Sequence, residues 1–256
     1  NNCPLPVPSM AMADGAVETA GGVEVLASGA VGPYNYDVIT SPDPDAMVKW
    51  LRENDYRVTP EMEPLIKVYN DEGMVFLAMK LQPDQGADEI QPVVMTYEST
   101  QPMIPIRLTA VAAMPDMTVL TWIFADAQTV PENYASPVIA DEDLRGNFGF
   151  GGNNYVQLLD STADDYEGLA FITEYAQPTT VFRELQPVDP LLRLLSEKYR
   201  YVTRHIGRIS PEEMVLDPVF RITGEDDTLE DVSNIRDLSE VDAHIYWNCP
   251  EIETED

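Results

Sequence analysis

The stretch IPIRLTAVAAMPDMTVLTWIFAD, residues 104–126, is the most apolar part of the chain, and the fold class depends on how it is interpreted. A membrane span would need about 20 uninterrupted apolar residues, but Arg107 lies near one end and Pro115-Asp116 interrupts the middle. A cofactor-binding βα unit would need a glycine-rich turn after a strand, and neither half is followed by one. The stretch therefore predicts two buried strands joined at residues 114–117, the central hairpin of a sheet.

The flanking sequence extends this hairpin into an α+β domain with a central, mainly antiparallel sheet. Alternating apolar and polar residues, and apolar runs bounded by turn formers, predict strands. Ser41 and Asp43 provide the start of one helix, and Thr59 and Pro60 the start of another. Strands are expected around residues 22–40, 74–126, 169–176 and 200–209, and helices around residues 43–55, 59–72, 154–165 and 189–199. Within residues 74–126, separate strands are expected at 74–82, at 89–99 and in each half of the opening stretch.

The chain is predicted to have three parts. Residues 22–223 form a single α+β domain, since 256 residues suffice for one large domain. Residues 1–21 are rich in Pro, Ala, Met and Gly without a steady period, which indicates an irregular arm suited to docking on a partner. Residues 224–256 form an acidic and mostly irregular segment.

The chain carries 45 acidic and 15 basic side chains, a net charge of −30. This charge repels phosphate backbones and anionic lipid heads, so neither nucleic-acid binding nor attachment to an anionic membrane is expected. The basic side chains are concentrated between residues 183 and 208, whereas residues 224–256 carry twelve acids against one base. We expect the acidic segment to lie near this basic segment, in the same molecule or in a neighbour. The candidate interaction residues are Arg193, Arg200, Arg204 and Arg208.

No nucleophile or zinc motif is present in the sequence, and no cofactor is expected. Asp141 and Asp143 match the beginning of a calcium loop, but residue 152 is Gly where the bidentate Glu would fall. His205 lies in an alternating strand and is predicted to be a surface or half-buried residue. His244, among acids and aromatic residues, is the better functional candidate, although packing explains it more simply.

The two cysteines lie near opposite ends of the chain. Cys3 and Cys249 each stand within the tripeptide Asn-Cys-Pro. In an oxidising compartment they could form one disulfide, and the alternative is two free thiols.

Several strings of the chain resemble one bacterial family. The opening stretch, with VGPYNYDVITSPDPDAMVKWLREND (residues 31–55) and RISPEEMVLDPVF (residues 208–220), is similar to the family catalogued as domain of unknown function 2330 (DUF2330). The resemblance extends over most of the chain, with a shorter segment at residues 10–21 than in the family. It implies an exported protein of the periplasm or cell surface whose leader peptide has been removed, with no established activity and no catalytic residues to carry over.

Together these features favour a non-catalytic, extracytoplasmic structural or interaction protein that binds protein partners in a larger envelope or cell-surface assembly. The first alternative is a periplasmic ligand-binding or hydrolytic domain that uses the loop 128–155 and His244. The second is a calcium-dependent adhesion module built on the carboxylate-rich loops.

Overall fold

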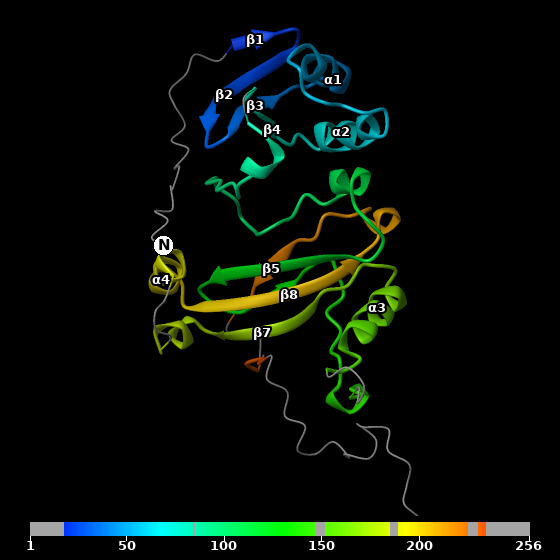
Figure 1. Ribbon diagram of the computed structural model, residues 1–256, viewed down its shortest axis with the longest axis vertical. Coiled ribbons are helices and arrows are strands. Elements are labelled where there is room, and N and C mark those ends of the chain that lie inside the picture. Colours follow the sequence, from blue (N-terminus) through cyan, green and yellow to red (C-terminus); the bar gives the residue numbers. More distant parts are fainter. Residues whose placement is uncertain (1–17, 84, 147–151, 185–188, 225–229, 234–256) are drawn as a thin grey trace, which may run out of the picture. The chain divides into compact units, whose positions relative to one another are not determined.

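The computed structural model describes residues 18–83, 85–146, 152–184, 189–224 and 230–233. The chain divides into two compact units, residues 1–99 and 100–256, and each contains its own antiparallel sheet (Figure 1). The sequence indicates one domain over residues 22–223 and no boundary at residue 99. Cys3, Cys249 and His244 lie outside the described residues.

The first unit contains a four-stranded antiparallel sheet in the order β1-β2-β3-β4. Its strands are β1 (Glu18–Ala20), β2 (Val23–Val31), β3 (Tyr34–Thr40) and β4 (Phe76–Leu81). Two helices between β3 and β4, α1 (Pro44–Glu53) and α2 (Met62–Asp71), lie together beside this sheet (Figure 1). Their buried faces meet the sheet in a core that includes Val23, Ile39, Met47 and Ile66. Residues 18–20 of the predicted irregular arm therefore form a strand instead, because they pair with β2.

Local sequence chemistry explains where these two helices begin and end. The side chain of Asp43 caps α1 by accepting a hydrogen bond from the backbone N–H of Asp45 at 2.9 Å, as the sequence predicts. The prediction that Thr59 caps α2 is wrong, because this helix begins at Met62 without a side-chain cap. Pro64 is tolerated because it falls in the first turn, where its missing N–H has no partner to lose. Gly73, at φ +73°, ends the helix in the left-handed region.

The second unit contains a three-stranded antiparallel sheet in the order β5-β8-β7 and a two-stranded sheet, β6-β9. Its strands are β5 (Met117–Ala125), β6 (Thr129–Pro131), β7 (Ile172–Pro178), β8 (Tyr201–Ile209) and β9 (Phe220–Ile222). Its helices are α3 (Tyr155–Asp165) and α4 (Pro190–Lys198). Short 3₁₀ helices are η1 (Ala87–Glu89) in the first unit and η2 (Arg107–Val111), η3 (Asp141–Asp143), η4 (Thr179–Glu184) and η5 (Pro211–Glu213) in the second.

Both faces of the three-stranded sheet are covered, but not equally. One face packs against Phe171, Phe220 and Met214, which form the main core of the unit. On the outer face, α3 covers one end through Leu159, which packs with Ile172 of β7. At β5 the outer face is open to solvent at Leu120 and Trp122, whereas the Phe124 ring lies 6.1 Å from the Phe182 ring.

The α+β class and the antiparallel pairing are confirmed, and so are the four predicted helices. Within the described ranges, however, the strands are distributed over three sheets rather than gathered in one central sheet. This division arises because the first four strands pair only with one another within residues 18–81.

The predicted hairpin in the opening stretch is wrong. Only its second half forms a strand, β5, and this strand pairs with β8 rather than with residues 104–113. The first half contains η2 instead. Asp217 explains the difference: its carboxylate accepts hydrogen bonds from the backbone N–H of Ile106 at 2.8 Å and from the guanidinium of Arg107 at 2.7 Å. These bonds hold the segment against the loop before β9.

The prediction of a strand at residues 89–99 is wrong, because this segment forms none. The segment has irregular backbone, and Ile90, Met95 and Tyr97 are exposed. Tyr34 anchors the segment, because its hydroxyl accepts a hydrogen bond from the N–H of Gln91 at 3.0 Å and donates one to the C=O of the same residue at 2.9 Å. An apolar strand pattern was therefore not sufficient to produce a strand here.

Candidate functional site

The outer face of the three-stranded sheet carries a group of contacting side chains at its solvent-exposed end. The strand register places Trp122 of β5 opposite Arg204 of β8, and Arg204 opposite Tyr175 of β7. The Trp122 and Tyr175 rings lie 6.0 Å apart, and the Arg204 guanidinium carbon lies 5.1 Å from the centre of the Trp122 ring. We call Leu120, Trp122, Tyr175 and Arg204 the Trp122 cluster.

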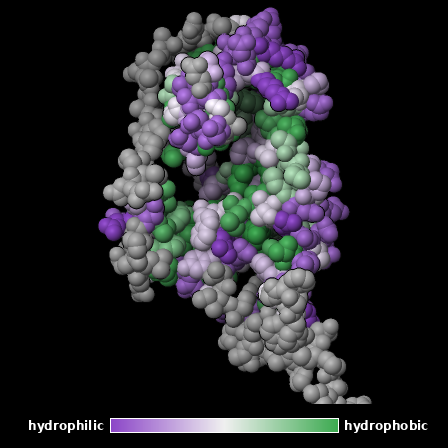
Figure 2. All heavy atoms as spheres, in the orientation of Figure 1, coloured by the Kyte–Doolittle hydropathy of each residue, from purple (hydrophilic) through white to green (hydrophobic). Residues whose placement is uncertain are grey.

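The Trp122 cluster presents apolar area to solvent. Trp122 is 46% exposed and Leu120, two residues earlier on the same face, is 49% exposed. In the view of Figure 2, hydrophobic residues reach the surface over β5 and β8. Single exposed apolar residues are ordinary, but adjacent ones beside an Arg and a Tyr form a contiguous patch.

An ion pair with Glu174 holds the side chain of Arg204 in place. Its Nε lies 3.1 Å from Glu174 Oε2, in an ion pair whose side chains are largely buried. The Nε–H makes no hydrogen bond of good geometry, so charge attraction rather than a directed bond holds this pair. Glu174 also accepts a 2.7 Å hydrogen bond from the Tyr155 hydroxyl of α3. The guanidinium is therefore positioned against Trp122 without any ligand.

The edge of the sheet beside the patch is open. β5 pairs with β8 on one side, and no strand among the described residues pairs with its other side. The strand sequence, MTVLTWIFA, contains no charged residue and no proline. The opposite edge differs: Ala176 of β7 exchanges two backbone hydrogen bonds with Val232, at 2.7 and 2.9 Å.

The two hydrogen bonds between Ala176 and Val232 also indicate in which direction the backbone N–H and C=O groups of β5 point. Because Ala176 bonds outward, its partner Thr203 on β8 bonds toward β5, and Ile123 is the residue opposite Thr203. Alternation along the strand then directs the N–H and C=O groups of Leu120 and Trp122 to the free edge. The open edge and the exposed side chains therefore belong to the same residues.

The four arginines predicted as interaction residues do not form one patch. Arg204 and Arg208 lie on the outer face of the sheet, and each is already ion-paired, Arg208 to Asp160 of α3 at 2.6 Å. Arg193, on α4, and Arg200, before β8, are exposed, and no described residue forms an ion pair with either. Of the four, only Arg204 belongs to the Trp122 cluster.

The described part of the acidic segment, residues 230–233, reaches the same sheet. Val232 pairs with Ala176, and the carboxylate of Asp231 accepts a hydrogen bond from the Tyr201 hydroxyl at the start of β8. The contact is thus to a tyrosine within the basic segment rather than to one of its arginines. Burial and Asp231 together raise the pKa of Tyr201, so this hydroxyl stays a donor.

His205 is fully buried, and the expectation of a surface or half-buried residue is wrong. Its ring nitrogens lie 3.1 Å from the hydroxyls of Thr129 and Thr173, and its ring stacks on Phe220 at 4.9 Å. Burial lowers the pKa of His205 to about 4, so the ring is neutral near pH 7. The sequence indicates this burial only through the alternation of the strand, in which His205 shares a face with Thr203, Gly207 and Ile209, and this face is turned to the core.

The remaining predicted site residues are dispersed. Asp141 and Asp143 lie in η3, and among the described residues no group of three or more His, Cys, Asp or Glu side chains is placed to hold a metal ion. Tyr155 begins α3 and bonds Glu174. The loop predicted over residues 128–155 includes β6 and η3, and His244 lies outside the described residues.

Within the part of the chain that the structure describes, no helix has the length and apolarity that crossing a bilayer requires.

These features define an α+β protein of antiparallel sheets with an exposed aromatic cluster at an open strand edge. Residues 3–221 match the model of a family described as "Uncharacterized protein conserved in bacteria (DUF2330)". The chain belongs to this family, which confirms the resemblance in its sequence. No curated protein and no solved structure matches the chain.

Proposed function

We propose that the protein is a non-catalytic interaction subunit that binds a protein partner through the open edge of β5 and the Trp122 cluster. The observation that carries the proposal is that Leu120 and Trp122 present both free backbone groups and exposed side chains at one edge. Its place is an extracytoplasmic envelope or cell-surface assembly, which rests on the export that the family resemblance implies.

The backbone of β5 suits the addition of a strand. An unpaired edge offers a row of N–H and C=O groups to an extended segment, and proteins usually protect such edges with charges, prolines or a covering element. β5 has no charge and no proline, and no described strand covers it. The partner therefore supplies an extended segment with apolar side chains.

The side chains of the Trp122 cluster suit a binding surface. Trp, Tyr and Arg are the residue types that dominate the binding energy of protein interfaces. Here Trp122 contacts both Tyr175 and Arg204, and the ion pair with Glu174 holds Arg204 in place before binding. A preorganised cluster loses less side-chain entropy when a partner binds.

The net charge of the chain limits which charge the partner can carry. With a net charge of −30, the protein repels strongly acidic molecules at low ionic strength. A neutral or basic partner segment is therefore expected, and the binding of a basic segment should weaken as the salt concentration rises.

The proposal is tested by size-exclusion chromatography and cross-linking of native envelope extract. The wild-type chain is expected in a complex larger than the monomer. Trp122→Ala, which removes the exposed indole, and Leu120→Pro, which removes one outward N–H, are each expected to release the monomer.

Val138→Ala is the matched control, because Val138 is 86% exposed in the same unit and belongs neither to β5 nor to the Trp122 cluster. This variant should stay in the complex. The proposal fails if the wild-type protein is a free monomer at every salt concentration, or if both β5 variants keep the complex.

A further inference from the structure

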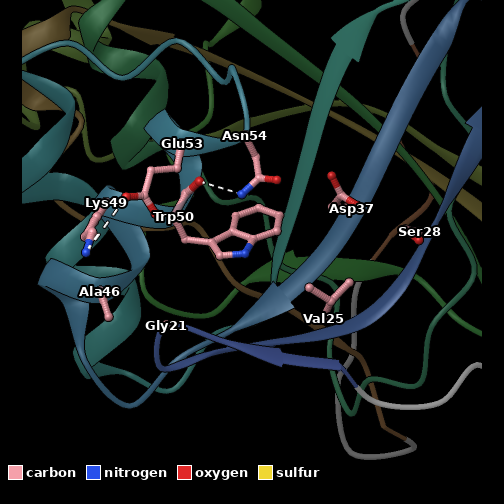
Figure 3. A pocket seen from close by; sticks show the side chains of 9 residues that line it. All are labelled: Gly21, Val25, Ser28, Asp37, Ala46, Lys49, Trp50, Glu53 and Asn54. Atoms are coloured by element: carbon pink, nitrogen blue, oxygen red, sulfur yellow. Dashed lines mark hydrogen bonds and ion pairs between the residues drawn. The ribbon is translucent and has the colours of Figure 1, made fainter.

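A cleft in the first unit has no role in the proposed partner binding. It lies between α1 and the strands β2 and β3, with a volume of about 350 Å³. Figure 3 shows the indole of Trp50 extending from α1 toward the strands, with Asp37 and Val25 on the other side. Ligand pockets in proteins begin at about this volume, so the cleft suits a small molecule.

Several polar groups at this cleft have no hydrogen-bond partner among the described residues. Trp50 is only 8% exposed, yet no described residue accepts a hydrogen bond from its Nε1–H. The hydroxyl of Ser28 and the Oδ1 of Asn54 also lack a described partner. These groups line the open cleft, so a bound ligand can form hydrogen bonds with them.

The walls of the cleft are fixed without a ligand. Trp50 stacks on Tyr56 with ring centres 6.3 Å apart, and the Tyr56 hydroxyl donates to Asp37 Oδ2 at 2.6 Å. The ammonium of Lys80 lies 4.8 Å from the centre of the Tyr56 ring and donates to the backbone C=O of Asn54 at 2.6 Å. Burial and the bond to Asp37 raise the pKa of Tyr56, so the hydroxyl remains a donor and Asp37 keeps its other oxygen for a ligand.

The charges at the cleft exclude two classes of ligand. Asp37 and the overall charge of −30 repel anions, and Lys49 is already paired with Glu53 at 3.8 Å. Among the described residues no carboxylate cluster is suited to a metal ion. The remaining classes are neutral polar molecules and organic monocations.

The hydrogen-bond donors and acceptors that line the cleft decide between a neutral polar molecule and an organic monocation. An ammonium group only donates, so it would leave the indole N–H of Trp50 without an acceptor. A hydroxyl group both donates and accepts, so adjacent hydroxyls could satisfy Trp50, Ser28 and Asp37 together. The apolar indole ring and Val25 offer a surface for the C–H groups of the same molecule.

We propose that the cleft between α1 and the strands β2 and β3 binds a neutral polyhydroxylated molecule of about the size of a monosaccharide. The Trp50 N–H and the Ser28 hydroxyl donate to ligand oxygens, while Asp37 and Asn54 accept from ligand hydroxyls. The cleft lies within the first unit, so its occupation is independent of the Trp122 cluster.

The test is isothermal titration calorimetry of the full chain with glucose, N-acetylglucosamine and myo-inositol as probes, and with choline as the cationic comparison. We expect saturable binding of at least one polyol and none of choline. Trp50→Phe keeps the aromatic wall and removes the N–H, and Ser28→Ala removes only a hydroxyl. Each variant should weaken the binding about tenfold, the effect of one hydrogen bond.

Val75→Ala is the control, because Val75 is exposed in the same unit and does not line the cleft. Its affinity for the polyol should equal that of the wild-type chain. If Trp50→Phe unfolds, Ser28→Ala alone decides, since its side chain is not part of the core. Absence of polyol binding, binding of choline instead, or affinities unchanged in Ser28→Ala would each overturn the proposal.

Discussion

His205 is a neutral core residue, and its burial makes the stability of the second unit depend on pH. The pKa is about 4 in the folded chain against 6.5 in the unfolded chain. Between these values the unfolded state binds more protons, so the contribution of His205 is complete above pH 6.5 and is lost as the pH falls toward 4.

This pH dependence predicts a measurable loss of stability at acidic pH. Between pH 7 and pH 4.5 the free energy of unfolding should fall by about 2–3 kcal/mol through His205, in addition to the effect of the carboxylates. Urea unfolding of wild type and His205→Asn at both values of pH measures this difference, because Asn does not titrate. Equal losses in the two proteins would contradict the burial of a neutral ring.

Asp217 is the residue that decides the conformation of residues 104–107. It is buried, pairs with Arg107 and accepts backbone hydrogen bonds from Ile106 and Arg107. Asp217→Ala should lower the free energy of unfolding by about 3–5 kcal/mol, since it removes the carboxylate that pairs with a largely buried guanidinium. Chemical denaturation checks this value. Lys67→Ala, which breaks an exposed pair with Asp71, should change it by only about 0–1 kcal/mol.

Among the elements, β5 shows what an apolar sequence pattern predicts and what it does not predict. Its apolar sequence predicts a strand correctly, but the predicted partner, residues 104–113, is wrong. The error is physical: a period of two indicates that a segment suits a strand and does not indicate which edge it meets. The same limit explains residues 89–99, where the pattern is present and no described strand pairs with it.

The assigned register predicts different effects for two neighbouring prolines in β5. Leu120→Pro removes an N–H that faces the free edge, so the far-UV circular dichroism should be kept, with a small loss of stability. Val119→Pro removes an N–H bonded to β8 and should cost about 3 kcal/mol or more. Denaturant unfolding of both variants tests the register, and the reverse order of effects would show that the other residues face the edge.

At the scale of the whole molecule, the division into two units has a consequence for proteolysis. The connecting segment has irregular backbone, and Tyr97 is 71% exposed. Exposed irregular backbone is the preferred site of proteolytic cleavage. Brief chymotrypsin treatment should therefore cut after Tyr97 before it cuts after the buried Tyr69, and mass spectrometry of the fragments identifies the site. Early cleavage at Tyr69 would show that the first unit is not compact.

The proposed functions belong to different units, which keeps their tests separate. Partner binding depends on the Trp122 cluster within residues 100–256, and polyol binding depends on a cleft within residues 1–99. Trp122→Ala should abolish the first and leave the second, and Ser28→Ala should do the reverse.

The sequence by itself determined the α+β class, the four helices, most of the strands and the family. These features follow from capping residues, turn formers and periodic apolar patterns, which act over a few residues. Tertiary structure decided the pairing of β5 with β8, the burial of His205, the contacts of the Trp122 cluster and the cleft beside Trp50. Each of these joins segments distant in the sequence, because a strand edge or a buried polar group is satisfied by whichever residues the folded chain brings beside it.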